Sequence, residues 1–210
     1  MKKSSSIAFI GIATVTLMAI ALASFIYWHQ LGKSNSKKLP TPGFLPVVHV
    51  GGPFTLMDHN KRQITEKSFP GKFLLITFGY THCPDICPSG LSNISNALKK
   101  LGKTAKLIQP LFITVDPERD TPKVLASYVD HFHPSLRGLT GQKTQIESVA
   151  RAFRIFSHTV TQDDASEYLL NHTTFIYLMA PNGKLARIFR HQTAADNLAM
   201  AISAELYKDR

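Results

Sequence analysis

The sequence predicts an α/β fold, in which helices cover both faces of a mixed β-sheet, preceded by a single transmembrane helix. Residues 7–28 are 22 successive positions without a charge, which is long enough for a helix to span a bilayer. Two apolar runs, residues 73–78 and 107–115, are typical of buried strands, and each is followed by apolar residues at helical spacing. Alternation of strands and helices is the pattern of an α/β fold.

The N-terminal part is predicted to be a membrane anchor joined to a soluble domain by a linker. The predicted segments are a lead (residues 1–6), the anchor (7–28), the linker (29–45) and the domain (46–210). Tyr27 and Trp28 end the apolar stretch, as aromatic residues do at a membrane interface. A cleaved signal peptide is the alternative, because Ala21 and Ala23 resemble a cleavage site. The apolar run continues past them, which favours an uncleaved anchor.

The net charge of +10 is unevenly distributed along the chain. Five of the 24 Lys and Arg residues lie at or before Lys38 and all 14 Asp and Glu residues lie after it, which leaves the soluble part with a net +5. These charges are scattered, without an Arg-rich helix or an aromatic RNA-binding motif. The chain is therefore not predicted to bind nucleic acid.

The domain is predicted to begin with an N-terminal hairpin, in which residues 54–57 and 63–65 flank a polar turn. The strand at residues 73–78 follows, and its helix extends to about Leu101. The second buried strand, at residues 107–115, leads to the next helix.

Three further helices are predicted from apolar residues three or four positions apart. Their inward-facing residues are Val124, Leu125, Tyr128, Val129 and Phe132 in the first, Ile146, Val149, Ala150 and Phe153 in the second, and Leu198, Ile202 and Leu206 in the third. Residues 173–180 and 184–190 flank a Pro-Asn-Gly turn, which predicts a hairpin before the last helix. With a short strand between the first two of these helices, the order β-α-β-α-β-α-β-β-α is typical of a thioredoxin-like fold.

The only two cysteines, Cys83 and Cys87, lie on the turn between the strand at residues 73–78 and its helix. Each precedes a proline, which disfavours α backbone at the cysteine and makes Pro88 a good first helical residue. Cys87 is then expected beside the positive end of the helix, which lowers a thiol pKa. The resulting thiolate is the form that binds metals and exchanges disulfides.

Two structural roles are the alternatives for this cysteine pair. A disulfide closing a five-residue loop would stabilise the fold by only about 2 kcal/mol through chain entropy. A purely structural disulfide is therefore not expected between Cys83 and Cys87. Structural zinc needs four ligands, and the chain has no second cysteine pair.

Three motifs carry a resemblance to a known family. They are CPDICP at residues 83–88, VDPERDTP at 115–122 and NHTTF at 171–175. In this order they resemble the Sco/SenC family of cytochrome c oxidase assembly proteins, over about residues 46–207. The resemblance implies that the domain binds one copper ion, as Cu(I) or Cu(II), through Cys83, Cys87 and His172. It further implies delivery of the copper to the CuA site of cytochrome c oxidase, with an upstream copper donor and a thiol reductant as other partners.

His172 is expected at the head of the strand that begins at Thr173, facing the dithiol. Thiolates are soft ligands that favour Cu(I), and an imidazole adds a ligand that also tolerates Cu(II). A surface position or a partner at the strand end is the alternative for His172. His82, beside Cys83, is expected on the surface. Asp116 is expected to contact the ligands rather than the metal, where it could orient His172 or tune the thiols. The alternative is that it only forms a turn or a helix cap.

A protein thiol:disulfide reductase is the alternative function, with Cys83 as nucleophile, Cys87 as resolving thiol and a redox disulfide between them. A metallochaperone, by contrast, is not expected to be an enzyme. A peroxidase would need polar residues around a lone peroxidatic cysteine, which the sequence does not suggest. The lead lacks an Arg-rich import signal, which predicts a single-pass protein of the bacterial inner membrane. The resemblance places its domain in the periplasm, where working thiols must be kept reduced.

Overall fold

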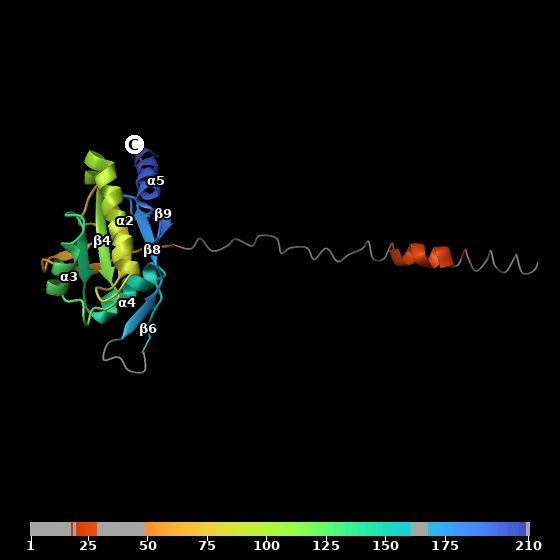
Figure 1. Cartoon of the computed structure of the whole chain (residues 1–210), viewed down its shortest axis with the longest axis horizontal. Helices are drawn as coiled ribbons and strands as arrows, with labels where there is room; N and C mark the ends of the chain where they lie inside the picture. Colours follow the sequence, from red (N-terminus) through yellow and green to blue (C-terminus); the bar gives the residue numbers. More distant parts are fainter. Residues whose placement is uncertain (1–17, 19, 29–48, 161–167, 209–210) are drawn as a thin grey trace, which may run out of the picture. The chain divides into compact units, whose positions relative to one another are not determined.

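The structure is a computed structural model of the 210-residue chain that describes residues 18, 20–28, 49–160 and 168–208, with only the backbone of Thr159, Val160, Asn171 and His172 (Figure 1). It divides into two units, Met1–Val48 and His49–Arg210.

In the first unit, residues 20–28 are helical and their side chains are exposed. No helix among the described residues is long and apolar enough to cross a membrane. Most of the predicted anchor, residues 7–17 and 19, lies outside the described residues, as do the predicted lead and linker.

The second unit contains a seven-stranded mixed sheet in the order β2-β1-β5-β4-β3-β8-β9. Its strands are β1 (Thr55–Asp58), β2 (Gln63–Thr65), β3 (Phe73–Gly79), β4 (Ile108–Thr114), β5 (Arg137–Thr140), β8 (Phe175–Met179) and β9 (Leu185–Arg190). The central strand β3 pairs in parallel with β4 and antiparallel with β8. Every residue of β3 and β4 is buried, which explains why both strands are continuous apolar runs in the sequence.

Helices cover both faces of this sheet, as predicted. They are α2 (Ile86–Leu101), followed by the 3₁₀ turn η1 (Gly102–Leu107), then α3 (Pro122–Val129), α4 (Lys143–Ala152) and α5 (Ala195–Lys208). Leu91, Leu125 and Leu198 bring α2, α3 and α5 onto one face, whereas Ile146 and Val149 bring α4 onto the other. Successive side chains of β3 point to opposite faces of the sheet. Leu75 therefore packs against α2, α3 and α5, and Ile76 packs on the face that α4 covers.

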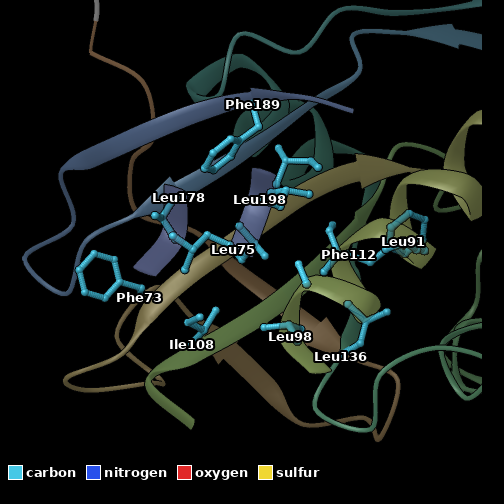
Figure 2. Close-up of a cluster of buried hydrophobic side chains, with 14 of the residues drawn as sticks. Phe73, Leu75, Leu91, Leu98, Ile108, Phe112, Leu136, Leu178, Phe189 and Leu198 are labelled. Carbon is cyan, nitrogen blue, oxygen red and sulfur yellow. The ribbon is translucent and has the colours of Figure 1, made fainter. Parts of the chain in front are cut away.

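Figure 2 shows the larger of the two cores, the one between the sheet and the helices α2, α3 and α5. Its labelled residues are Phe73, Leu75, Leu91, Leu98, Ile108, Phe112, Leu136, Leu178, Phe189 and Leu198. Leu75, Leu91 and Leu198 have no exposed surface. This core fixes the end of β3 against the start of α2, where the two cysteines lie.

Three predictions about the helices α2 and α3 were wrong. Helix α2 begins at Ile86 rather than Pro88. In α3, Val124 is exposed rather than inward-facing, because only Leu125 and Val129 of that helix are buried. Phe132 lies beyond the end of α3, although its ring packs on Tyr128.

A second, two-stranded sheet was not predicted. It consists of β6 (Ser157–Val160) and β7 (Leu169–His172), paired antiparallel with Ser157 opposite His172. His172 therefore ends β7 rather than heading β8, which begins at Phe175. In Figure 1 this hairpin lies beside α4.

Candidate functional site

The two cysteines lie on either side of the start of α2. Cys83 is in the loop that follows β3 and is partly exposed, whereas Cys87 is in the first turn of α2 and has no exposed surface. The amide N–H of Cys87 donates to the sulfur of Cys83 over 3.4 Å, and the amide of Cys83 donates to the carbonyl of Tyr80. Neither cysteine is in a disulfide. The fold thus brings two thiols together, one accessible and one buried.

The thiol of Cys87 has a raised pKa, contrary to the prediction from its place at a helix start. The hydrogen bond with the Cys83 side chain raises the pKa first, and burial raises it further, while the backbone N–H of Tyr80 acts in the opposite direction. The side chain points into the domain: a Cβ atom added at Gly79 would lie 2.8 Å from the Cys87 sulfur and 2.7 Å from the Phe112 ring. Burial and the neighbouring thiol therefore outweigh the helix end.

Asp120 is a fully buried carboxylate that contacts the dithiol loop, which is the segment of residues 80–85 between β3 and α2. It accepts hydrogen bonds from the backbone N–H of Thr81 (3.0 Å), the hydroxyl of Thr81 (2.6 Å) and the hydroxyl of Thr114 (2.6 Å). Burial raises the pKa of Asp120, and these three bonds oppose the rise. The carboxylate thus ties the dithiol loop to the end of β4.

His82 is exposed, as predicted, with its Nδ1 3.1 Å from the Thr81 hydroxyl and 4.0 Å from the Asp120 carboxylate. The helix α3 that follows Asp120 is capped by Thr121, whose hydroxyl accepts from the amide of Val124. Neither Asp116 nor Asp120 is the cap residue of that helix.

Asp116 is buried, and each of its carboxylate oxygens has a partner. Nε of Arg119 lies 2.5 Å from Oδ2, and the hydroxyl of Tyr168 donates to Oδ1 over 2.9 Å. Nη1 of Arg119 donates to the carbonyl of Tyr168, and the guanidinium lies 3.7 Å from the centroid of the Tyr168 ring. Tyr168 immediately precedes β7, so Asp116 and Arg119 hold the β6–β7 hairpin against the domain.

Tyr80 provides a second tether for the same hairpin. Its hydroxyl accepts from the amide of Leu170 over 3.1 Å, and the Arg119 guanidinium lies 5.7 Å from the centre of its ring. Tyr80 is three residues before Cys83, and Leu170 is two residues before His172. One side chain therefore links the dithiol loop to the strand that ends in the predicted third ligand.

The side chain of His172 lies outside the described residues, so its role as a ligand stays a prediction. Among the described side chains, no group of three His, Cys, Asp or Glu residues is placed to hold a metal ion. The two thiols fit a soft cation such as Cu(I) by their chemistry, since thiolates are the ligands that such ions prefer.

The sequence did not reveal Tyr80, Arg119 and Tyr168 as part of this region. They lie on the dithiol loop, on the loop after β4 and just before β7, and they meet only in the folded chain. Arg119 lies within the quoted VDPERDTP run, which is the one local signal that pointed to it.

Comparison with known proteins gives one family. A family model described as SCO1/SenC matches residues 45–207. The chain is 38% identical over 206 residues to "Protein sco1" of Schizosaccharomyces pombe, with 92% of this chain and 77% of that protein covered. It is 37% identical over 159 residues to "Protein SCO1 homolog, mitochondrial" of Homo sapiens, covering 75% of this chain but only 53% of that protein, so it spans about half the length of the human relative.

The fold is also similar to a solved structure, described as Arabidopsis thaliana ScoI with copper bound. The TM-score is 0.71 at 38% identity, and the match covers 76% of this chain and 99% of that one. The thioredoxin-like architecture predicted from the order of elements agrees with this similarity.

Proposed function

Because the chain belongs to the SCO1/SenC family, we propose that it is a copper chaperone acting in cytochrome c oxidase assembly. Cys83 and Cys87 hold one copper ion as cargo, His172 is the third ligand, and the ion is passed to the CuA site of the oxidase. The observation that carries the proposal is the pair of thiols in contact at the start of α2. The copper bound by the similar Arabidopsis protein supports the choice of metal.

The two thiols contribute differently to copper binding. Cys83 is partly exposed and meets the incoming ion first, and Cys87 completes the site from inside the domain. Thiols must lose their protons to become ligands, so copper binding releases protons. The raised pKa of Cys87 makes its proton the harder one to remove. Affinity for copper should therefore increase with pH.

The hairpin β6–β7 supplies the third ligand. Its tethers to Tyr80, Arg119 and Asp116 favour one position of the end of β7 relative to the dithiol loop. Asp116 then acts on His172 indirectly, through Tyr168 and the hairpin.

The anchor and the compartment belong to the same proposal. Residues 7–28 form a single uncleaved span of the bacterial inner membrane, and the domain lies in the periplasm with a thiol reductant and a copper donor as partners. The apolar side chains of the described part of this segment are all exposed, which suits contact with lipid. Mass spectrometry of the membrane-extracted protein tests the span: an N-terminus at Ser24 would show cleavage.

A thiol:disulfide reductase is the second candidate, and one observation favours it. A partly exposed Cys83 hydrogen-bonded to a buried Cys87 is the arrangement of an attacking and a resolving thiol. In this function Cys83 attacks a disulfide of the oxidase subunit, and Cys87 then displaces the reduced subunit while the protein forms its own disulfide.

The experiment separates the two functions. The reduced full chain is loaded with Cu(I), the metal is counted per protein, and the loaded protein is mixed with a reduced CuA-bearing domain. One copper per chain, and copper found on the CuA domain after the two proteins are separated, support the chaperone. The copper-free protein is mixed in parallel with the oxidised CuA domain. Disulfide exchange there, together with no transfer of copper, would replace the chaperone by the reductase.

A further inference from the structure

The peptide group between Ile86 and Cys87, in the first turn of α2, is hydrogen-bonded at both of its polar atoms. Its N–H donates to the sulfur of Cys83 over 3.4 Å, and its carbonyl oxygen lies 2.7 Å from Nε2 of His191. A peptide group is planar, so its N–H and its C=O rotate together. A rotation that turned the N–H away from the Cys83 sulfur would therefore also break the bond with His191.

The first turn of α2 has little support from its own segment of the chain. Among the described residues, Asp85 at the N-cap makes no side-chain capping hydrogen bond, and the first turn contains no acidic residue. An uncapped first turn leaves backbone groups unsatisfied and frays easily. The hydroxyl of Ser89 also donates to the Ile86 carbonyl, over 2.9 Å, but Ser89 is exposed and belongs to the same helix. His191 instead ties this turn to a different part of the domain.

His191 is itself firmly held next to strand β9, which ends at Arg190. Its side chain is only 3% exposed, and its backbone N–H donates to the carbonyl of Thr174 over 3.2 Å. Thr174 is two residues after His172, the proposed third ligand. His191 thus bonds through its side chain to the turn of Cys87 and through its backbone to the segment that follows His172.

We propose that His191 is a positioning residue for the dithiol, which keeps the N–H of Cys87 directed at the Cys83 sulfur and so holds the two thiols side by side. Nε2 carries the hydrogen of this contact, because a carbonyl oxygen can only accept. Donation to the carbonyl also polarises the peptide group and strengthens its N–H as a donor. In this role His191 acts through one peptide group rather than as a ligand.

A positioned pair of thiols should bind a thiophilic metal ion more tightly than a loose pair, because less ordering remains to be done on binding. Groups that orient metal ligands without touching the metal typically change metal affinity by about 10- to 100-fold. The copper form of this inference rests on the proposed function. The orientation of the Cys87 N–H does not, and it is measurable without any metal.

The test compares His191→Gln with His191→Met in the full chain, purified in detergent. The two side chains have similar length, but only Gln has an N–H donor near the place of Nε2. The control for a general loss of stability is Tyr177→Phe, which removes a buried 2.9 Å hydrogen bond to the carbonyl of Phe153 in the core on the other face of the sheet.

Three quantities are measured for each protein. The first is the amide proton resonance of Cys87, recorded by NMR in the reduced, metal-free state. The second is the affinity for Hg(II), which binds thiolate pairs whatever the biological cargo, determined by competition with a small thiol. The third is the temperature of thermal unfolding.

For His191→Met we expect the Cys87 amide proton to move upfield and Hg(II) affinity to fall about tenfold, and His191→Gln should recover most of both. Tyr177→Phe should unfold at a lower temperature with the Cys87 resonance and the affinity unchanged. The inference is overturned by wild-type values of both quantities in His191→Met, by an equal loss of affinity in Tyr177→Phe, or by the absence of any recovery in His191→Gln.

Two further arms keep the result decisive. If neither His191 variant folds, the wild-type protein is mixed with Hg(II): the Nε2 resonance of His191 should shift, whereas that of His133, whose ring bonds to Ser135, should not. An unshifted His191 resonance rejects the inference. The affinities are also measured with Cu(I). If the wild-type protein binds no Cu(I), the proposed function fails, and the Hg(II) results still decide the role of His191.

Discussion

Nε2 of His191 lies 2.7 Å from the carbonyl oxygen of Ile86, so the residue that follows β9 is hydrogen-bonded to the first turn of α2. The carbonyl can only accept, and Nε2 must therefore carry the hydrogen. The imidazole is buried and occupies the space beside Gly90, where an added Cβ would lie 1.9 Å from Nε2. The turn that carries Cys87 is thus supported from a part of the chain about a hundred residues away.

This contact reverses the usual effect of a helix substitution. Gly to Ala inside a helix normally stabilises by about 1 kcal/mol, but Gly90→Ala should destabilise by about 1–3 kcal/mol because the methyl group displaces the imidazole. Urea unfolding of the domain measures this. Combining Gly90→Ala with His191→Ala should recover part of the loss, and a stabilised Gly90→Ala single variant would contradict the contact.

Replacement of either cysteine should abolish stable copper binding without unfolding the domain. Cys83→Ser alters a partly exposed side chain, and Cys87→Ala removes one buried sulfur. We expect losses of about 1–2 kcal/mol at most for Cys87→Ala. Metal content after loading and the circular-dichroism spectrum are measured together, and a reduced variant without native spectrum at room temperature would make the pair structural.

His172→Ala distinguishes the chaperone from the reductase. It should weaken Cu(II) more than Cu(I), because two thiolates alone hold Cu(I), whereas Cu(II) prefers further nitrogen or oxygen ligands. Cycling of Cys83 and Cys87 between thiol and disulfide should continue, since it depends on the thiols and their access. Binding of both ions and the copper content of the oxidase in cells are measured. Normal values for all of them would exclude His172 as a ligand.

Tyr168→Phe should loosen the β6–β7 hairpin specifically. It removes the bond to Asp116, worth about 1.5–3 kcal/mol for a charged acceptor, and leaves the seven-stranded sheet intact. Hydrogen exchange should become faster at the amide of Leu170, with β8 as the internal control. Exchange that is unchanged in the hairpin, or faster throughout the sheet, would show that Tyr168 has another role.

Asp120→Asn should change the pH dependence of stability. Burial raises the pKa of Asp120 in the folded state, so the folded domain binds this proton more tightly than the unfolded chain does. The stability due to Asp120 is fully present below about pH 4 and decreases as pH rises through the raised pKa. The free energy of unfolding of wild type minus that of Asp120→Asn should therefore fall as pH rises above about 4. A difference that rises with pH would mean that the hydrogen bonds from Thr81 and Thr114 outweigh burial.

Local patterns in the sequence predicted most of the main sheet and its helices. The runs at β3 and β4 were recognisable because both strands are buried on both faces, and α4 because Ile146, Val149 and Ala150 keep helical spacing. The hairpin β6–β7 was missed because its strands are four residues long and are held by Tyr80 and Arg119, which are distant in sequence.

The environment of the site was harder to predict than its members. The cysteines and their position after β3 followed from the sequence, but the pKa direction of Cys87 did not. That direction depends on burial against Gly79 and Phe112 and on the contact with Cys83, and none of these can be inferred from the position of a residue at a helix start.

The pairing of β3 with β8 also constrains how the chain acquires its fold during synthesis. Leu75 faces Leu178 across this pair, about a hundred residues later in the chain, and such distant pairing slows folding. The segment with both cysteines emerges from the ribosome long before β8 can close the central strand. Until then the domain that buries Cys87 is incomplete, so a nascent or truncated chain exposes its thiols more readily to oxidants, and premature oxidation should be a hazard of its biogenesis.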